Sequence, residues 1–397
     1  MDNLQQLFYD KYAQTKISSV RDFINKIDLN DRLIGIKGSR GVGKTTLLLQ
    51  YIKKNFKPDN KVLYVSADNF WFAENRLYQL ADIFYKKGGR FLAVDEVHRY
   101  LNWSTELKNI YDDFPELKVI FTGSSLLHLH TAKADLSRRA VMYEMPGLSF
   151  GEFLFFETGI RFPIFEIDEI FKNHIEIAVE ITRKIRPLEY FSNYLNYGYY
   201  PYYLENKKTF HQKLYTSIQT VLEIDIPQFE NIQISNIIYL KKLLNIISNS
   251  VPFKPNFSSV SQRTGIAVNT LKKYIKYLND TELINLLYFP DKGINNLNKA
   301  EKIYLNNSNL IFNLSEETGN SGNIRETFFM NQVKYQNQIN ATKKGDFMIN
   351  NKYIAEIGGK NKQQKQIKDV KNAYIIKDDI QIGNDNIIPL WLFGFLY

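Results

Sequence analysis

Residues 38–45 read Gly-Ser-Arg-Gly-Val-Gly-Lys-Thr and match the phosphate-loop pattern G-x-x-x-x-G-K-[S/T] (Walker A) at every position. The glycines let the main chain curl so that successive N–H groups converge on phosphate oxygens, at the positive end of a helix predicted to begin near Lys44. Lys44 is expected to reach the β- and γ-phosphates, and Thr45 to ligate Mg²⁺. The alternative is a chance glycine-rich turn, which rarely lies between an apolar strand and a helix. The predicted nucleotide-binding residues are Gly38, Ser39, Arg40, Gly41, Val42, Gly43, Lys44, Thr45 and Thr46.

Short apolar runs alternate with longer helical patterns from Leu33 to about Met145. Near-continuous apolar runs are typical of strands in a parallel sheet covered on both faces, and the stretches between them have the period of crossover helices. The predicted strands are Leu33–Lys37, Val62–Val65, Phe91–Asp95 and Val119–Thr122. The predicted helices are Thr45–Asn55, Phe72–Lys87 and Thr105–Phe114. This order predicts an α/β domain built on a doubly wound parallel sheet.

Two carboxylates end the strand Phe91–Asp95, because Glu96 follows Asp95 directly (Walker B). Asp95 is expected to hold Mg²⁺, and Glu96 to orient and polarise the attacking water as a general base. A kinase acting on a small molecule has no obvious need of the second acid, so the pair favours hydrolysis. The alternative is a solvated strand end.

Small hydroxyl and basic residues follow the strand Val119–Thr122. Ser124 or Ser125 would lie at the carboxyl edge of the sheet and sense the γ-phosphate or the water, although either could equally cap the next helix. Arg138 or Arg139 is expected to stabilise transition-state charge, within the chain or at the site of a neighbouring subunit. An exposed ion-pair network is the equal alternative for these arginines.

The pattern divides the chain into a P-loop core with an N-terminal helical lead (residues 1–155), a helical lid and linker (156–230), a winged helix-turn-helix (231–297) and a small mixed α/β domain (298–397). In the winged segment, Lys272, Lys273 and Lys276 lie opposite the apolar helix face, which predicts either phosphate contacts with DNA or a solvated face on a protein-docking module. The final apolar run, Ile387–Tyr397, is predicted to be a buried terminal strand.

A second group of acidic and basic residues lies near the C-terminus. Asp346 and Glu356, on two predicted strands, would share a Mg²⁺ while Lys360 positions a hydroxide, with Glu326 and Gln366 assisting. The lysine stands four residues after the acid instead of the usual two, and a glycine bulge between them would draw it back. The segment is therefore either an active nuclease or a nuclease-like scaffold that binds nucleic acid or protein.

The composition is that of a folded chain of two or three domains: 44% of the 397 residues are hydrophobic and 23% are charged. The absence of cysteine excludes disulfides, thiolate metal sites and cysteine nucleophiles, and fits a reducing compartment. The net charge of +9 allows a polyanionic partner. Eight lysines and only three acids lie between Ala341 and Lys371, where a solvated lysine-rich helix is the alternative. No signal pattern or membrane-length apolar run is found, so we expect a cytoplasmic chain without a membrane partner.

Several motifs occur together in this chain: the phosphate loop, Asp95-Glu96-Val97-His98 with Trp103, Thr122–Ser125, Ser137-Arg138-Arg139 and Leu148–Phe153. In this combination they resemble a bacterial and archaeal family of AAA-type P-loop ATPases that carry a C-terminal domain of unknown function. The similarity continues through Tyr194–Pro201, Asp225–Pro227 and Ile388–Tyr397. It implies an AAA/ASCE-like core whose sensor strand lies between the phosphate-loop and carboxylate strands, a winged helix, and a terminal fold similar to restriction endonucleases.

The leading hypothesis is a Mg²⁺-dependent ATPase that hydrolyses ATP to ADP and phosphate and moves the lid, winged helix and C-terminal domain with its nucleotide state. ATP and Mg²⁺ are the expected cofactors, and DNA, a protein partner or further copies of the chain are the expected partners. The alternatives are an ATP-switched scaffold with little turnover and an ATP-regulated DNA nuclease.

Overall fold

The computed structural model describes residues 1–123, 136, 138–227, 232, 234–290, 300–315, 321–362, 367 and 370–397. The chain divides into two compact units, Met1–Gly147 and Leu148–Tyr397. Within the described ranges, no helix combines the length and the apolar character that crossing a bilayer requires.

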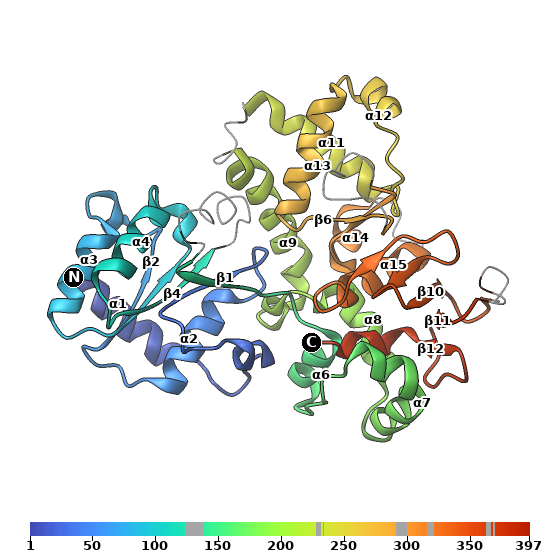
Figure 1. Cartoon of the computed structure of the whole chain (residues 1–397), viewed down its shortest axis with the longest axis horizontal. Helices are drawn as coiled ribbons and strands as arrows, with labels where there is room; N and C mark the ends of the chain where they lie inside the picture. Colours follow the sequence, from blue (N-terminus) through green and yellow to red (C-terminus); the bar gives the residue numbers. More distant parts are fainter. Residues whose placement is uncertain are drawn as a thin grey trace. The chain divides into compact units, whose positions relative to one another are not determined.

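A five-stranded sheet in the order β2–β3–β4–β1–β5 forms the centre of the first unit (Figure 1). Its strands are β1 (Leu33–Lys37), β2 (Val62–Ser66), β3 (Phe91–Asp95), β4 (Lys118–Gly123) and β5 (Ala140–Glu144). Every neighbouring pair is parallel. The predicted P-loop α/β fold is confirmed, and β4 lies between the phosphate-loop strand β1 and the carboxylate strand β3, as the resemblance implied.

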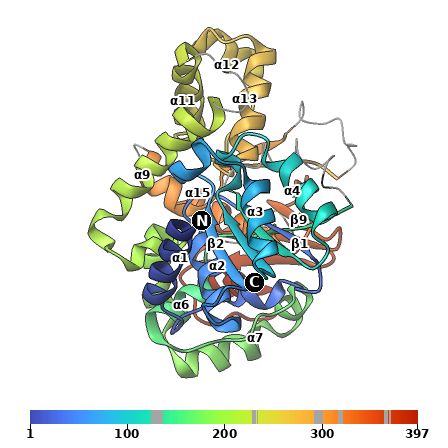
Figure 2. The same cartoon turned by 90° about the vertical axis from the view of Figure 1, so that its left-hand side faces the viewer.

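Helices cover both faces of this sheet. One face carries α1 (Asp2–Gln14) and α2 (Lys44–Asn55), and the other carries α3 (Leu77–Lys86) and α4 (Trp103–Asp113) (Figure 2). The connections contain the short 3-10 helices η1 (Asp22–Lys26), η2 (Phe70–Ala73) and η3 (Val97–Arg99). The residues that α2 and α3 bury recur at helical spacing, among them Leu47, Leu48, Ile52, Leu77, Leu80, Ala81 and Phe84.

The predicted helix Phe72–Lys87 is wrong at its start, because the structure divides this stretch into η2 and α3. The Asn69 side chain accepts a hydrogen bond from the N–H of Trp71 at 2.9 Å, which starts the short turn of η2. Arg76 is extended, and its N–H donates to Gln79 Oε1 at 3.3 Å. The Gln79 side chain thereby caps the start of the longer helix, which begins at Leu77.

The second unit begins with helices. They are α6 (Phe150–Thr158), α7 (Ile167–Lys184), α8 (Pro187–Asn193), α9 (Phe210–Thr220), α11 (Ile234–Ser248), α12 (Phe257–Thr264), α13 (Val268–Asp280), α14 (Ser308–Leu314) and α15 (Ser321–Val333). Between α8 and α11 lie also two π-helical turns, η4 (Tyr194–Gly198) and η7 (Val221–Asp225), and two 3-10 turns, η5 (Pro201–Leu204) and η6 (Lys207–Thr209). Asn309 of α14 ties η4 to the core, because its side chain accepts from the N–H of Tyr199 at 2.9 Å and donates to the Leu195 carbonyl at 2.8 Å.

The segment expected to be a winged helix contains α11, α12 and α13 followed by a two-stranded antiparallel sheet of β6 (Ile284–Leu287) and β7 (Lys302–Leu305). Gly265 ends α12 in the left-handed conformation that glycine favours, with φ of 72°. Of the three lysines on α13, Lys273 and Lys276 are exposed and Lys272 is half-buried, whereas Leu271 and Leu278 are fully buried.

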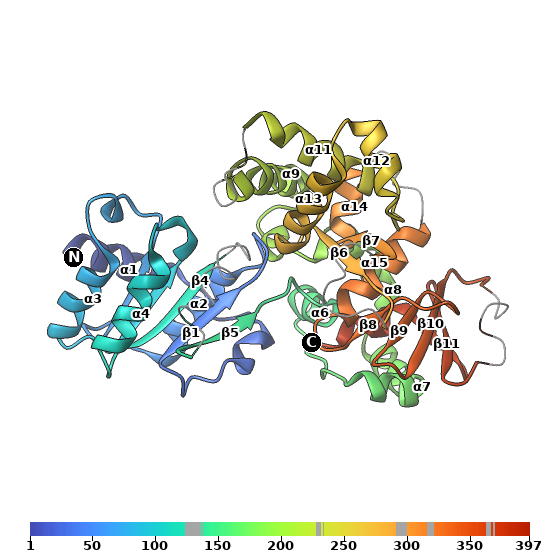
Figure 3. The ribbon, with the colours of Figure 1, turned by 45° about the horizontal axis from the view of Figure 1, so that its top comes forward.

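A second five-stranded sheet, in the order β12–β11–β10–β9–β8, lies near the C-terminus, and Figure 3 shows β8 to β11 side by side. Its strands are β8 (Ile339–Asn340), β9 (Phe347–Ile349), β10 (Tyr353–Gly358), β11 (Ala373–Lys377) and β12 (Ile387–Pro389). The segment predicted as a lid, 156–230, lies in this same unit, where α7 packs on β12.

The predicted terminal strand Ile387–Tyr397 is too long. Only Ile387–Pro389 pair with β11, and Leu390–Phe395 form a 3-10 helix, η9. Pro389 has no N–H to donate, so the strand ends at this residue. The predicted burial holds, because Leu390–Phe395 are all buried.

Candidate nucleotide-binding site

The phosphate loop joins β1 to α2 and depends on its glycines. Gly41 and Gly43 have φ angles of 87° and 96°, in the left-handed region that favours glycine. A Cβ atom on Gly38 would lie 2.3 Å from the Met145 carbonyl oxygen, so no side chain fits there. Gly43 is the N-cap of α2 and places no side chain over the first N–H groups of the helix. These groups therefore suit an anion, because the first turn of a helix leaves its N–H donors without helical partners.

Lys44 folds back into the loop. Its side chain is buried, and Nζ donates to the carbonyl oxygens of Gly38 at 2.7 Å and Ser39 at 2.9 Å. The ammonium group thus lies inside the curl of main chain that would surround a phosphate. The donors present, backbone N–H groups and one ammonium, are those that phosphate oxygens require.

Asp95 is buried at the end of β3 and accepts bonds from three hydroxyl groups. Thr45 Oγ1 and Tyr64 Oη donate to Oδ2 at 2.7 and 2.8 Å, and Thr122 Oγ1 donates to Oδ1. Burial, together with the adjacent Asp95, raises the pKa of Tyr64, so this phenol stays a donor. The pairing of the Thr45 hydroxyl with the Asp95 carboxylate fits Mg²⁺, which prefers oxygen ligands of this kind.

Glu96 adopts a left-handed backbone conformation, with φ of 54°, directly after Asp95. Its N–H donates to Thr122 Oγ1 at 3.2 Å, and its Oε2 lies 3.4 Å from Nε2 of the buried His98. Burial raises the pKa of the Glu96 carboxyl; Lys44 opposes this rise, and the Asp95 carboxylate adds to it. A carboxylate with a raised pKa is a stronger proton acceptor, which suits a general base.

The sequence pattern did not identify Arg21, Tyr64, Thr122 or His98 as individual contributors. Arg21 is buried, and its guanidinium donates to the carbonyls of Val42 at 3.1 Å, Pro146 at 2.7 Å and Gly147 at 2.8 Å. It thereby fixes the phosphate loop to the segment that leaves β5. The sequence offered no signal for Arg21 except that a basic residue stands before β1. Its partners are main-chain carbonyls, which every residue has, so no sequence motif marks them.

The remaining predicted residues are the serines after β4 and the two arginines before β5. Ser124 is outside the described residues, as is Ser137. Arg139 forms a bidentate ion pair with Asp112 at 2.8 and 3.0 Å, and Arg138 is exposed beside it. Both arginines precede β5, whose first residue pairs with Leu33 at the start of β1. At about 3.3 Å per residue, the length of β1 separates this edge from the phosphate loop, so the structure does not bring either arginine to the loop of its own chain.

The second predicted site has a different lysine from the one expected. Lys362 Nζ lies 2.6 Å from Oε1 of the buried Glu356, whereas Lys360 is exposed. Asp346 Oδ1 lies 3.4 Å from Lys302 Nζ, which also lies 3.5 Å from Glu326 Oε2. The predicted place of Lys360 is therefore corrected: β10 ends at Gly358, and the turn that begins at Gly359 brings Lys362 back to the acid.

This region gathers no metal cluster in the described part of the chain, where no three His, Asp or Glu side chains lie together as ligands. Gln366 is outside the described residues. Each of the three acids is instead near a lysine ammonium group. The geometry is therefore that of one buried and two half-buried carboxylates, each beside a lysine.

Changing Lys362 to Met should make stability strongly dependent on pH. Burial already raises the pKa of Glu356, and Lys362 opposes that rise. Without Lys362 the pKa of Glu356 in the folded state rises further above its value in the unfolded state. The contribution of Glu356 to folding stability is then kept below the unfolded-state pKa and lost as pH rises through the folded-state pKa. We expect a loss of about 1–3 kcal/mol near pH 8 and a smaller loss near pH 5, measured by urea unfolding. The matched control is Lys360→Met, and equal losses in both variants at both pH values would contradict the assignment of Lys362.

Two parts of the chain match known family models. Residues 30–154 match the family model described as an AAA domain. The chain carries a P-loop AAA domain. The matched range contains the phosphate loop, Asp95 and Glu96. Residues 188–321, from α8 to the start of α15, match a domain of unknown function.

Solved structures similar to the chain are distant. A Walker-type ATPase of Pyrococcus abyssi is 14% identical, over 72% of this chain and 91% of that chain, with a TM-score of 0.41. AMPPCP-bound DnaA from Aquifex aeolicus is 17% identical, over 69% and 86%, with a TM-score of 0.25. No curated protein matches the chain in sequence. The assignment of the AAA domain rests on the family match and on the geometry of its loop.

Proposed function

We propose that the chain is a Mg²⁺-dependent ATPase that hydrolyses ATP to ADP and phosphate. The observation that carries the proposal is the convergence of Lys44, Thr45, Asp95 and Glu96 at the carboxyl edge of one parallel sheet. Ligands bind at this edge in doubly wound folds. A phosphate loop followed by two adjacent carboxylates supplies both the phosphate-binding and the proton-accepting groups that hydrolysis needs.

In this proposal the loop binds the phosphates and the two carboxylates divide the remaining tasks. The Lys44 ammonium and the first N–H groups of α2 bind phosphate oxygens, while Thr45 and Asp95 would hold Mg²⁺. The metal ion, when bound, neutralises charge on the β- and γ-phosphates. Glu96 accepts a proton as the water oxygen bonds to the γ-phosphorus and the bond to the β-phosphate oxygen breaks, which leaves ADP and phosphate.

The second unit is proposed to couple nucleotide state to a partner. Helices α11 to α13 and the sheet of β6 and β7 have the element order of a winged helix, and Lys273 and Lys276 are exposed on α13. These lysines support contact with a polyanion such as DNA. A protein partner or further copies of the chain remain alternatives to DNA in the same proposal.

The test is release of phosphate from ATP by a sample of defined size, with Mg²⁺ or with EDTA, and with or without duplex DNA. We expect steady release that EDTA abolishes, and stimulation by DNA that declines with salt because phosphate contacts release counterions. Tight ATP binding without release, with or without DNA, would contradict hydrolysis and support the ATP-switched scaffold instead. If DNA left the rate of phosphate release unchanged, the proposed ATPase activity would stand, and DNA would not be its partner.

A further inference from the structure

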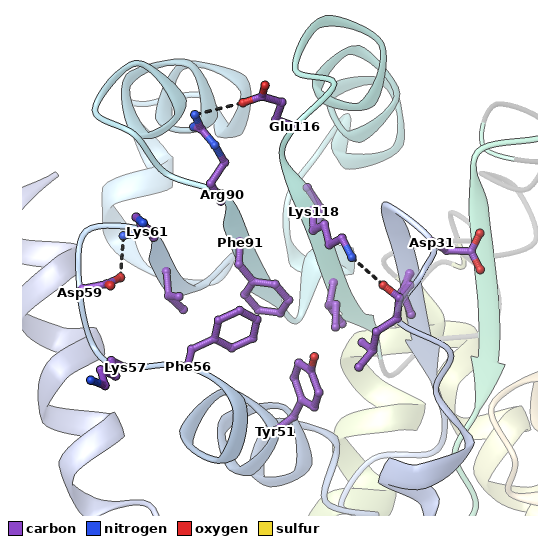
Figure 4. Close-up of a pocket in the computed structure, with 15 residues that line it drawn as sticks. Asp31, Tyr51, Phe56, Lys57, Asp59, Lys61, Arg90, Phe91, Glu116 and Lys118 are labelled. Carbon is purple, nitrogen blue, oxygen red and sulfur yellow. Dashed lines mark hydrogen bonds and ion pairs between the residues drawn. The ribbon is translucent and has the colours of Figure 1, made fainter.

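A cavity of about 370 Å³ lies in the first unit at the amino edge of the parallel sheet. Val62, Phe91 and Val119, near the starts of β2, β3 and β4, form part of its lining, and Phe91 is labelled in Figure 4. The phosphate loop follows the carboxyl end of β1, so this cavity is separate from the nucleotide site. Its volume is within the range of small-molecule sites, about 300–1,000 Å³.

The floor of the cavity is apolar and largely aromatic. The rings of Phe56 and Phe91 lie 4.5 Å apart, and that of Tyr51 lies 5.9 Å from Phe91. Phe91 and Tyr51 are buried, whereas Phe56 is half-buried and presents part of its ring to the cavity. Because planar apolar groups pack well on such rings, this floor suits an aromatic body.

The rim of the cavity carries basic side chains that form no ion pair with the described residues. Four of the seven charged lining residues are basic. Arg90 is paired with Glu116 at 3.0 Å, and Asp59 Oδ1 accepts from the N–H of Lys61 at 2.9 Å within its own loop. The ammonium groups of Lys57 and Lys61 form no hydrogen bond or ion pair with any described residue.

The arrangement of these charges indicates the orientation of a ligand. Lys57, Asp59 and Lys61 lie on the same side of the cavity as Phe56, which gives that side a net positive charge, and Asp31 lies on the opposite side (Figure 4). Lys118 donates to the Leu29 carbonyl at 2.8 Å, which leaves its charge without a carboxylate partner. An anionic group is therefore favoured beside the two lysines, with an apolar body over the aromatic floor.

We propose that this cavity binds a small aromatic anion. Its rings pack on Phe56 and Phe91, and its carboxylate, sulfonate or phosphate lies beside Lys57 and Lys61. The site does not depend on ATP hydrolysis, because none of the residues that line it belongs to the phosphate loop or to the carboxylate pair of β3.

A pair of fluorescent probes that differ in one group tests the proposal on the full chain. The first probe is 8-anilinonaphthalene-1-sulfonate, and the second is N-phenyl-1-naphthylamine, which has the same rings without the sulfonate. We expect one saturable site per chain for the sulfonate, and weaker binding of the neutral probe by at least about tenfold. Excess ATP with Mg²⁺ should leave the bound sulfonate in place, whereas its displacement would assign the probe to the nucleotide site and overturn the proposal.

Four variants locate the probe. The double variant Lys57→Glu and Lys61→Glu should weaken the sulfonate at least about tenfold and leave the neutral probe within about twofold. Phe56→Ser should weaken both probes. The matched controls are Lys54→Glu, an exposed lysine of α2 outside the cavity, and Phe70→Ser, whose ring is 95% exposed. Neither control should change binding, and circular dichroism melting of each variant shows that the fold is intact.

Methyl NMR provides a measurement that does not depend on substitution. Ile34, Val62, Val119 and Ile120 line the cavity, so their methyl signals should shift as the sulfonate saturates. Unshifted signals at these residues, or binding that Phe70→Ser weakens and Phe56→Ser does not, would overturn the proposal. Equal loss of both probes in the double lysine variant would also overturn it, because the lysines would then not recognise the anion.

Discussion

Lys44→Ala should lower the affinity for ATP by about 3 kcal/mol, roughly a hundredfold, because it removes the one ammonium group inside the phosphate loop. Lys44 Nζ donates to the Gly38 and Ser39 carbonyls, so it already lies where the β- and γ-phosphate oxygens would be bound. Equilibrium binding of a fluorescent ATP analogue with Mg²⁺ measures the loss. Phosphate release should disappear at ATP concentrations that saturate the unmodified chain.

The matched control is Lys54→Ala, which removes an exposed lysine from the same helix, α2. Its ATP affinity should stay within about twofold of the unmodified value, since exposed charges far from a site contribute little to it. Normal phosphate release by Lys44→Ala would refute the assignment of the loop as the nucleotide site.

Glu96→Gln should bind ATP normally and hydrolyse it about 10²–10⁴ times more slowly. The amide has nearly the shape of the carboxylate, and the contact of the Glu96 N–H with Thr122 Oγ1 belongs to the main chain, so the local structure should be kept. The substitution removes the proton acceptor, together with the carboxylate charge beside His98 Nε2. Single-turnover phosphate release and filter retention of ATP measure the two effects separately.

Glu74→Gln is the matched control, because Glu74 is an exposed glutamate of the same unit, directly after η2. Its turnover should be unchanged. If Glu96→Gln released phosphate at the rate of this control, Glu96 could not be the general base, and the water would have to be activated by another group.

The strands that carry the site were predictable because each is buried on both faces and reads as a continuous apolar run. Strands β1 and β3 have the predicted bounds, and β4 differs from its prediction by one residue at each end. Strand β5 was missed for the opposite reason: it lies at the sheet edge, and Val141 and Met142 within it are exposed. An edge strand that buries little apolar surface leaves no such run.

Side-chain contacts were less predictable than strands. The motif spacing predicted Thr45 and Asp95 at one edge of the sheet, and their hydrogen bond places them there. Arg21, in contrast, contacts the main-chain carbonyls of Pro146 and Gly147, which are more than a hundred residues away in the sequence. The hydrophobic periodicity of the sequence cannot predict such a contact. Lys362, and not the predicted Lys360, lies beside Glu356 for a similar reason. The number of residues between an acid and a lysine does not determine the path of a turn that follows two glycines.

The support of the phosphate loop has a consequence for how this sequence can change during evolution. Arg21 and Gly38 both contact carbonyl oxygens, those of Val42, Met145, Pro146 and Gly147. Every amino acid has a carbonyl oxygen, so these contacts place little restriction on which residues supply it. Selection should therefore act unequally on the two sides: positions 21 and 38 should tolerate almost no replacement, while position 145, whose side chain is fully buried, should accept other apolar residues of similar size as long as its backbone path is kept.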